Sequence, residues 1–484
     1  MKHPSRRKFL QTVGATSAAI AIGGCSLKSL QKRKPNIIFF MADDLGYNEV
    51  GCYGQQKIRT PHIDRLAAEG VRFIQSYSGS PVCAPSRCVL LTGKHTGHAY
   101  IRTNREVKPE GQLPIPDETL TIAELLKAQG YVTAAIGKWG LGPPGSEGDP
   151  LNQGFDHFFG YNCQRQAHNY YPRYLWSDRQ KVNLPGNDRG LTGKFYAPDL
   201  MEEEALNFIR DNKEKPFFLY YPTPVPHVAL QVPDDSLQEY LGLWDDPPYD
   251  GSKGYLPNEH PRATYAAMVT RMDRTLGRMM ALLKELDLDE NTIVFFTSDN
   301  GPTYVGGYDL DFFDGNGPLR SRKGFVYEGG IRVPFIVRWP GRIKPGSETE
   351  HITAFQDVMP TLMELVGAAD QTPEDIDGIS FVPTLTGKGK QAEHEYLYME
   401  FPSYGGQQMV RMGDWKAVRK NLFKDPNAPI ELYNLKEDIG ETTDVADQHP
   451  DIVEKIREIM KSARTPSRAF PFPALDNAAK GAVS

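Results

Sequence analysis

Two pairs of polar side chains directly follow apolar runs that lie far apart in the chain. Asp43 and Asp44 come after "NIIFFMA", and Asp299 and Asn300 come after "NTIVFFTS". Carboxylate and amide oxygens are hard ligands that suit Ca²⁺ or Mg²⁺. A single pair of this kind more often caps a helix or forms a turn. Two pairs at equivalent strand ends favour a shared metal site.

Three basic residues stand in comparable positions. His227 lies just beyond a third apolar run, in "KPFFLYYPTPVPH", and Lys138 lies at the end of a fourth, in "YVTAAIGKWG". Lys323 occurs in the glycine-flanked segment "PLRSRKGFVYEGG". Taken singly, each is most simply a surface residue. If they converge beside a metal, they form a cationic pocket suited to a tetrahedral oxyanion.

Buried strands and amphipathic helices must bring these residues together. The four runs above and "RVPFIVRWPG" are short and apolar, and all except the last end in polar or charged residues. Between two of them, residues 262–286 have the apolar periodicity of a helix. This alternation predicts an α/β fold with a large, mixed, mostly parallel sheet flanked by helices and with functional groups at strand ends. The apolar stripe of the helix consists of Val269, Met272, Leu276, Met279, Met280 and Leu283.

From about residue 390 the pattern changes to short strand-like segments followed by one helix. The segments are "EYLYMEF", "QQMVRMGDWKAVRK" and "PIELYNL", and the helix is "HPDIVEKIREIMKSAR". That order predicts a smaller antiparallel unit packed on the first. We therefore expect a catalytic domain over residues 35–389 and a C-terminal antiparallel subdomain with an irregular tail over 390–484.

Composition and charge narrow the class of protein. With 484 residues, 39% hydrophobic and 24% charged, the chain is not disordered or fibrous. The formal charge of -6 is mild, and Lys and Arg are scattered, so no nucleic-acid partner is expected. The 5 cysteines form no C-x-x-C motif and no paired spacing, so neither a zinc site nor a disulfide scaffold is indicated, and at most one disulfide is expected.

The N-terminal segment has the features of a bacterial export signal. Arg6 and Arg7 precede a short, weakly apolar stretch that ends in "IGGC". This stretch is too short to span a membrane, and its end resembles a lipobox in which Cys25 would be lipidated. We expect an export signal over residues 1–24, a linker over 25–34, and a periplasmic or cell-surface lipoprotein whose only membrane contact is its anchor. A cytosolic tail is the alternative.

The segment around Cys83 carries the most specific signal in the chain. "CAPSR" fits the pattern C-x-P-S-R, which arises by chance in a chain this long on the order of once in a thousand. It continues as "CAPSRCVLLTG", and "GYVTAAIGKWG", "MADDLGY", "TPHIDRLA", "FTSDNG" and "YEGGIRVPFIVRWPG" also occur. With these motifs, residues 35 to 345 resemble the type I sulfatases of the alkaline phosphatase superfamily. The resemblance implies that a sulfatase-modifying enzyme oxidises Cys83 to Cα-formylglycine, whereas a plain buried cysteine is the alternative.

The resemblance also implies roles for the other residues of a sulfuric ester hydrolase. One hydroxyl of the hydrated aldehyde would attack sulfur, and the second would lose a proton to expel sulfate and restore the aldehyde. One Ca²⁺, held by the two polar pairs and residue 83, would polarise a sulfate oxygen. Arg87 would brace residue 83, Lys138 and Lys323 would bind sulfate oxygens, and His227 would be the general acid.

One position departs from the resemblance. Many members read G-K-W-H-L-G where this chain has "GKWGLG", so Gly140 replaces a histidine that helps handle the bridging oxygen or the formylglycine hydroxyl. Either His227 and a lysine suffice, or another residue such as His168 fills the gap. Two rival interpretations are a phosphonate or phosphate monoester hydrolase of the same superfamily and a non-catalytic lipoprotein that binds sulfated glycans.

A segment after the "GKWGLG" motif is dense in groups able to contact a sugar. "GYNCQRQAHNYYPRYLW" offers Arg165 and His168 for hydroxyls or charge, and Tyr170, Tyr171 and Trp176 for stacking. A structural aromatic cluster is the alternative. The segment and "GKWGLG" look like bacterial polysaccharide sulfatases, some of which act on galactose or N-acetylgalactosamine sulfates. The resemblance therefore implies a sulfated carbohydrate substrate.

Overall fold

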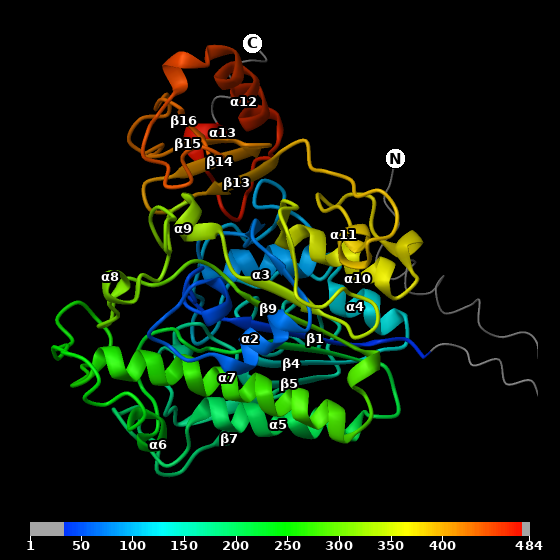
Figure 1. Cartoon of the computed structure of the whole chain (residues 1–484), viewed down its shortest axis with the longest axis vertical. Coiled ribbons are helices and arrows are strands. Elements are labelled where there is room, and N and C mark those ends of the chain that lie inside the picture. Colours follow the sequence, from blue (N-terminus) through cyan, green and yellow to red (C-terminus); the bar gives the residue numbers. More distant parts are fainter. Residues whose placement is uncertain (1–32, 477–484) are drawn as a thin grey trace, which may run out of the picture.

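Ten strands of the computed structural model form one large sheet (Figure 1). The model describes residues 33–476, so the expected export signal and Cys25 lie outside the described residues. The strand order is β11-β2-β10-β9-β1-β8-β4-β5-β6-β7, and the central strands β9, β1, β8, β4 and β5 are mutually parallel. This confirms the predicted large, mixed, mostly parallel sheet. The strands are β1 (Asn36–Ala42), β2 (Val71–Phe73), β4 (Val132–Lys138), β5 (His157–Tyr161), β6 (Tyr174–Ser177), β7 (Gln180–Asn183), β8 (Phe217–Pro222), β9 (Thr292–Ser298), β10 (Phe335–Arg338) and β11 (Ser347–Thr349).

Helices cover both faces of the sheet because its central strands are apolar on both sides. In β1, Ile38 and Phe40 face one core and Ile37 and Phe39 face the other. The first core contains α2 (Pro61–Ala68), α5 (Ala197–Asp211) and α7 (Pro261–Glu285), and the predicted stripe of α7 is buried in it apart from the half-buried Met280. The second core contains α3 (Cys83–Thr92), α4 (Ile122–Ala128) and α10 (Val358–Leu365), on the opposite side of the sheet in Figure 1.

The parallel strands bring the predicted polar residues to one edge of the sheet. Ala42 at the end of β1 pairs with Ser298 at the end of β9, so the polar pairs that follow these strands are neighbours. Strands β8 and β4 continue the same parallel set and carry His227 and Lys138 at or beyond their carboxyl ends. Strand β10 runs antiparallel to β9 and therefore ends at the opposite edge, where Arg338 pairs with Glu69 and Asp289.

A second sheet forms near the C-terminus, as the sequence predicted. Its four antiparallel strands are β13 (Leu397–Phe401), β14 (Gln407–Met412), β15 (Trp415–Arg419) and β16 (Glu431–Asn434). Helix α12 (Pro450–Ser462) packs on one face, and the other face meets α9 (Glu328–Ile331) and its neighbours in the larger unit. A fully buried ion pair joins the two units, with Lys416 Nζ 2.8 Å from Oε1 of Glu328.

No helix within residues 33–476 is long and apolar enough to cross a membrane. The described cysteines Cys52, Cys83, Cys88 and Cys163 are all free. The remaining elements include β3 (Ser76–Tyr77), α6 (Asp234–Leu237), α8 (Leu310–Phe313), β12 (Thr353–Ala354), α11 (Val382–Thr386) and α13 (Pro473–Asp476).

Candidate active site

Cys83 is the first residue of helix α3, which the sequence did not predict as a helix. Val82 before it is extended, and Gly93 ends the helix in a left-handed conformation with φ 70°. All ten residues of α3 are buried, so packing on both sides fixes the position of Cys83. The positive end of the helix dipole lies at residue 83 and favours an anion there.

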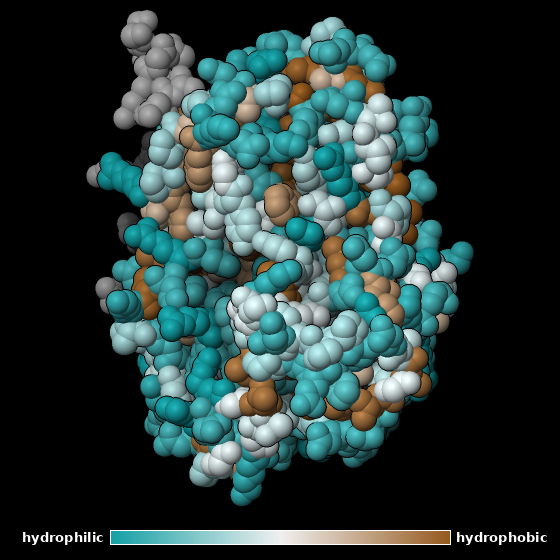
Figure 2. All heavy atoms as spheres, turned by 90° about the vertical axis from the view of Figure 1, so that its left-hand side faces the viewer, coloured by the Kyte–Doolittle hydropathy of each residue, from teal (hydrophilic) through white to brown (hydrophobic). Residues whose placement is uncertain are grey.

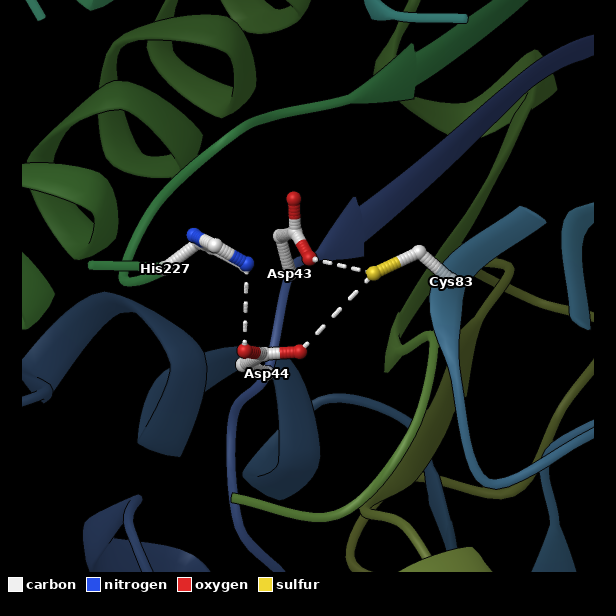
Figure 3. Close-up of side chains that lie close together, drawn as sticks. All are labelled: Asp43, Asp44, Cys83 and His227. Carbon is white, nitrogen blue, oxygen red and sulfur yellow. Dashed lines mark hydrogen bonds and ion pairs between the residues drawn. The ribbon is translucent and has the colours of Figure 1, made fainter. Parts of the chain in front are cut away.

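Two of the side chains predicted to bind a metal, Asp43 and Asp44, lie against Cys83 (Figure 3). Its Sγ lies 3.4 Å from Oδ1 of Asp43 and 4.0 Å from Oδ1 of Asp44. Asn300 Nδ2 donates to Oδ1 of Asp44 at 2.8 Å, and the backbone N–H of Asp44 donates to Oδ1 of Asp299 at 3.1 Å. The structure therefore brings together all five predicted ligands from the ends of β1 and β9 and the start of α3.

Two lysines flank the same sulfur atom. Lys138 Nζ lies 2.5 Å from Oδ2 of Asp43 and 3.7 Å from Sγ of Cys83. Lys323 Nζ, from the loop between α8 and α9, lies 2.7 Å from the carboxylate of Asp44 and 3.6 Å from the same Sγ. Both ammonium groups can thus reach an anion placed against residue 83.

Arg87 connects the helix to the acidic residues. It lies one turn beyond Cys83 in α3 and donates from Nη2 to Oδ2 of Asp299 at 2.8 Å. Its Nη1 donates to the backbone carbonyl of Lys138. The guanidinium is fully buried, and such a charge is tolerated only when it is paired and hydrogen-bonded. Arg87 therefore fixes α3 against the ends of β9 and β4.

Burial and charge shift the protonation of the site. Burial by itself would raise the pKa of Asp43, but neighbouring cations, Lys138 first, hold it well below its usual value. Burial and the charge of Asp43 raise the pKa of Asp299 to about 6, against the effect of Arg87. Burial, followed by the charge of Asp43, raises the pKa of the Cys83 thiol. Without a cation beside it the thiol therefore stays neutral, and a neutral thiol is a poor nucleophile.

His227 faces the carboxylates from the loop after β8. Its Nε2 lies 3.5 Å from Oδ2 of Asp44, and its Nδ1 donates to the backbone carbonyl of Val228. Burial and then the positive charge of Lys323 lower the pKa of the imidazole. The ring of His168 stacks on it, with centroids 4.7 Å apart. The nitrogen that His227 presents to the site is therefore Nε2.

The site has the donors that a hard divalent cation needs. Three carboxylates and an amide oxygen meet there, which is the oxygen-rich set that Ca²⁺ or Mg²⁺ prefers. Oδ1 of Asn300 is buried without a hydrogen-bond partner among the described residues, as expected for an oxygen that awaits a ligand. Ligand atoms of Asp43, Asp44, Cys83 and His227 all lie within 4.8 Å of one another. The residues present fit the predicted cation.

A second group of possible metal ligands has a simpler explanation. His95, His98 and Asp377 meet just beyond the C-terminal end of α3. His98 Nδ1 lies 2.8 Å from Oδ1 of Asp377, and the backbone N–H of Gly97 donates to Nδ1 of His95. A neutral His95 ring that accepts at Nδ1 carries its proton on Nε2, which faces Asp377. This cluster is therefore a hydrogen-bonded link between two segments.

A cavity of about 810 Å³ opens in front of Cys83. Two of the predicted substrate contacts, Arg165 and His168, line it together with His227 and Lys323. The side chain of Arg165 is 74% exposed, so it stands at the mouth of the cavity rather than against residue 83.

The three aromatic residues predicted to stack on a sugar do not line this cavity. The hydroxyl of Tyr170 is buried and donates to the backbone carbonyls of Pro224 and His227, both at 2.6 Å. Tyr171 is buried in the first core, and Trp176 donates from Nε1 to Glu110 at 2.9 Å. The alternative of a structural cluster describes them better, and Tyr170 supports the loop that carries His227.

Other cavity residues were missed by the sequence analysis. Tyr404, half exposed, comes from the loop between β13 and β14, so the C-terminal sheet supplies part of the wall. Tyr255 lies with its ring centroid 5.3 Å from that of His168. No sequence signal marks either residue as near Cys83. Gln164 could have been found, because it adjoins Arg165 in the segment already singled out.

Comparisons with known families and proteins agree with this geometry. A family model described as "Sulfatase" matches residues 35–368. A second model, described as "N-sulphoglucosamine sulphohydrolase, C-terminal", matches residues 321–466. The two matches together span most of the described residues.

Individual relatives are similar over almost the whole chain. An N-acetylgalactosamine-6-sulfatase of Canis lupus familiaris is 31% identical over 90% of this chain and 81% of its own length. An N-acetylgalactosamine-6-O-sulfatase of Bacteroides thetaiotaomicron is 30% identical over 91% of this chain and 96% of its own. Among solved structures, Ps i-CgsB in complex with k-i-k-neocarrahexaose has a TM-score of 0.75 at 29% identity, covering 93% of this chain and 96% of that one.

Proposed function

This chain belongs to the sulfatase family and hydrolyses sulfate esters, and from that premise we propose that it acts on a sulfated carbohydrate. The proposed substrate is a galactose or N-acetylgalactosamine sulfate of a polysaccharide or glycosaminoglycan. The observation that carries the proposal is the similarity, over about nine-tenths of the chain, to two relatives named for N-acetylgalactosamine 6-sulfate. The cavity in front of Cys83, with Arg165 and His168 on its wall, leaves room for a sugar.

We propose that Cys83 is converted to Cα-formylglycine by a sulfatase-modifying enzyme. The hydrate of this aldehyde supplies a hydroxyl nucleophile that is more reactive than a serine. The five-residue tag "CAPSR" supports the proposal, and so does the convergence of the carboxylates on residue 83. The buried Arg87 then holds α3, and with it residue 83, against the strand ends.

We further propose that the metal is one Ca²⁺, held by Asp43, Asp44, Asp299 and Asn300 together with residue 83. A cation bound there would polarise a sulfate oxygen. Lys138 and Lys323 bind the remaining sulfate oxygens, since both ammonium groups lie within 3.7 Å of Sγ of Cys83. These charges are already in place before substrate arrives, which is the arrangement that stabilises developing negative charge most effectively.

His227 is the proposed proton donor to the leaving sugar oxygen. Because Nδ1 donates to Val228, a proton on Nε2 requires the imidazolium form of the ring. An anionic sulfate ester in the cavity favours that form, since a nearby negative charge raises the pKa of a histidine. The ring is held by the stacked His168 and by the Tyr170 hydroxyl beneath its loop.

Export from a bacterial cell is the proposed setting of this activity. The paired Arg6 and Arg7 and the "IGGC" that ends in Cys25 support a lipoprotein signal over residues 1–24. A lipid anchor on Cys25 would hold the enzyme at the periplasmic or outer cell surface, where it meets polysaccharide. The catalytic domain would then begin at residue 35, after a basic linker.

Parallel assays of sulfate and phosphate esters test the function. Protein made together with a sulfatase-modifying enzyme is expected to hydrolyse defined galactose and N-acetylgalactosamine sulfates, and to prefer nitrophenyl sulfate to nitrophenyl phosphate. The measurement is kcat/KM for each ester. Faster turnover of the phosphate or of a phosphonate monoester would favour the rival hydrolase, and activity on aryl sulfates alone would refute the carbohydrate substrate.

His227→Ala should slow sugar sulfates far more than nitrophenyl sulfate. A sugar alcohol is a poor leaving group that needs a proton, and general acid help is typically worth ~10²–10⁴-fold. Nitrophenolate leaves readily without one, so its turnover should fall much less. The measurement is kcat for both substrates in the same preparation. Equal losses would instead assign His227 to sulfate binding or nucleophile positioning, and no loss on sugar sulfates would exclude it from the mechanism.

A further inference from the structure

A second cavity adjoins the one in front of Cys83. Its volume is about 570 Å³, and its wall comes from α8, the loop that follows α8 and the C-terminal sheet. Tyr404 belongs to the walls of both cavities. Its ring centroid lies 5.6 Å from that of Phe401 in the first cavity and 6.3 Å from that of Phe325 in the second. Because Tyr404 is half exposed, it forms the boundary at which the two cavities meet.

The loop between α8 and α9 passes from one cavity to the other between two consecutive residues. Lys323 lines the first cavity, whereas Arg322 lines the second. The guanidinium carbon of Arg322 lies 4.2 Å from the ring centroid of Tyr304. The side chain of Tyr304 also hydrogen-bonds to that of Tyr404. The guanidinium of Arg322 therefore lies close to the boundary between the cavities.

Arg322 is the cation of this second cavity that has no anionic partner. Lys420 pairs with Glu431 at 2.6 Å, and Arg320 donates from Nη1 to the hydroxyl of Tyr433 at 3.0 Å. Arg322 is exposed, and its guanidinium forms no ion pair or hydrogen bond with the residues that the structure describes. An anion that enters the cavity can therefore bind this guanidinium without displacing a carboxylate from it.

Two carboxylates of the same cavity direct an anion towards Arg322. They belong to Asp311 and Asp314, in α8 and at its C-terminal end. Because like charges repel, an anion is less stable beside α8 than beside Arg322. The planar guanidinium also presents paired N–H donors that match two oxygens of a sulfate or a carboxylate. The favourable place for an anionic group is thus next to the boundary with the first cavity.

We propose that the second cavity binds the sugar next to the one that is desulfated, and that Arg322 binds an anionic group, a sulfate or a carboxylate, on this neighbouring sugar. The inference rests on the proposed carbohydrate substrate. The ester that is cleaved lies in the cavity in front of Cys83, so a substrate that extends past Tyr404 contains at least two sugars. The enzyme therefore selects for an anionic chain rather than for a single sugar.

Three matched oligosaccharides test the proposal. They carry the same sulfated sugar, and its neighbour is neutral, sulfated or a uronic acid. In wild-type protein, kcat/KM should be roughly 10-fold higher for an anionic neighbour than for the neutral one, the effect of one charge-assisted hydrogen bond. Comparison of the sulfated and uronic substrates shows which anion is bound. Because salt screens exposed charges, the preference should shrink as ionic strength rises.

Arg322→Gln should remove this preference. The substitution deletes the charge, so kcat/KM for the anionic substrates should fall to the value for the neutral oligosaccharide. Arg342→Gln is the matched control, because Arg342 is also exposed and its guanidinium carbon lies 5.6 Å from the ring centroid of Trp339, yet it lines neither cavity. That variant should keep the wild-type preference. Melting temperatures of both variants check that they are folded.

Each outcome bears on the proposal. A preference for an anionic neighbour that is lost in Arg322→Gln and kept in Arg342→Gln supports it. Equal kcat/KM for all three oligosaccharides in wild-type protein, or a preference that survives in folded Arg322→Gln, would overturn it while leaving the carbohydrate substrate intact. A wild-type enzyme that hydrolyses nitrophenyl sulfate but none of the sugar sulfates would overturn the carbohydrate substrate and this inference together.

Discussion

Cys83→Ala is expected to reduce turnover of every sulfate ester to background, by roughly 10⁴- to 10⁶-fold, the scale reached when a covalent nucleophile is removed. The change removes the sulfur atom that the oxidation of Cβ to an aldehyde requires, and it leaves an unreactive methyl group at position 83. Alanine is small, fits the first turn of a buried helix and leaves the surrounding ion pairs of Asp43 and Asp44 in place. The fold should therefore survive, and a melting curve checks this.

Cys83→Ser separates the modification from a simple hydroxyl nucleophile. Serine presents an oxygen at nearly the same position but is not a substrate for a modifying enzyme that oxidises cysteine, so this variant should also be inactive. Mass spectrometry of the tryptic peptide that ends at Arg87 should show an aldehyde at residue 83 in active wild-type protein. Fully active protein in which that peptide carries only an unmodified thiol would refute the proposed mechanism.

Asp299→Asn should abolish retention of Ca²⁺ and lower activity by roughly 10²- to 10⁴-fold, because Lewis-acid help from a metal is worth several kcal/mol. The substitution removes one of three charges from the hard-cation site with almost no change of volume. Arg87 loses its 2.8 Å partner but keeps Asp43 at 3.4 Å, so the buried guanidinium is not stranded. The metal content of purified protein measures the loss directly.

Thermal denaturation gives a second readout that does not depend on activity. Wild-type protein stripped with a chelator should melt at a higher temperature when Ca²⁺ is restored, since a ligand that binds only the folded state stabilises it, and Asp299→Asn should not respond. Asp273→Asn is the control, because this buried carboxylate accepts from the backbone N–H groups of His62 and Ile63 and has a structural role. It should lose stability yet keep its Ca²⁺ response. Full activity of metal-free wild-type protein would refute the metal site.

The C-terminal sheet belongs to the active site as well as to the fold. Tyr404 and Ser403 from the loop after β13 line the same cavity as Cys83. The buried contact between Lys416 and Glu328 holds this sheet against the larger unit, so the wall of the cavity depends on that docking.

Figure 2 shows that one face of the molecule is mostly hydrophilic, with only scattered apolar side chains.

The residues around Cys83 could be predicted because each of them belongs to a recognisable local sequence pattern. Asp43 and Asp299 follow strands whose apolar character is plain in the sequence, and parallel strands in one sheet end at the same edge. Cys83 lies in a five-residue tag that is rarely met by chance. The apolar runs therefore predicted a shared site for the two polar pairs, and the family resemblance added Cys83 to it. The 3.4 Å between Sγ of Cys83 and Oδ1 of Asp43 agrees with that prediction.

The other residues that line the cavity in front of Cys83 could not be predicted in the same way, because burial depends on segments that meet only in the folded chain. The sequence by itself determined the fold class, the family and the residues around Sγ of Cys83. Only the tertiary structure decided that Tyr170 points into the core, that Tyr404 reaches the cavity from another sheet, and that Gly140 makes room for Gln164. The sequence does not show whether a tyrosine or a glutamine is covered by its neighbours or faces a ligand, because those neighbours come from strands and loops far away along the chain.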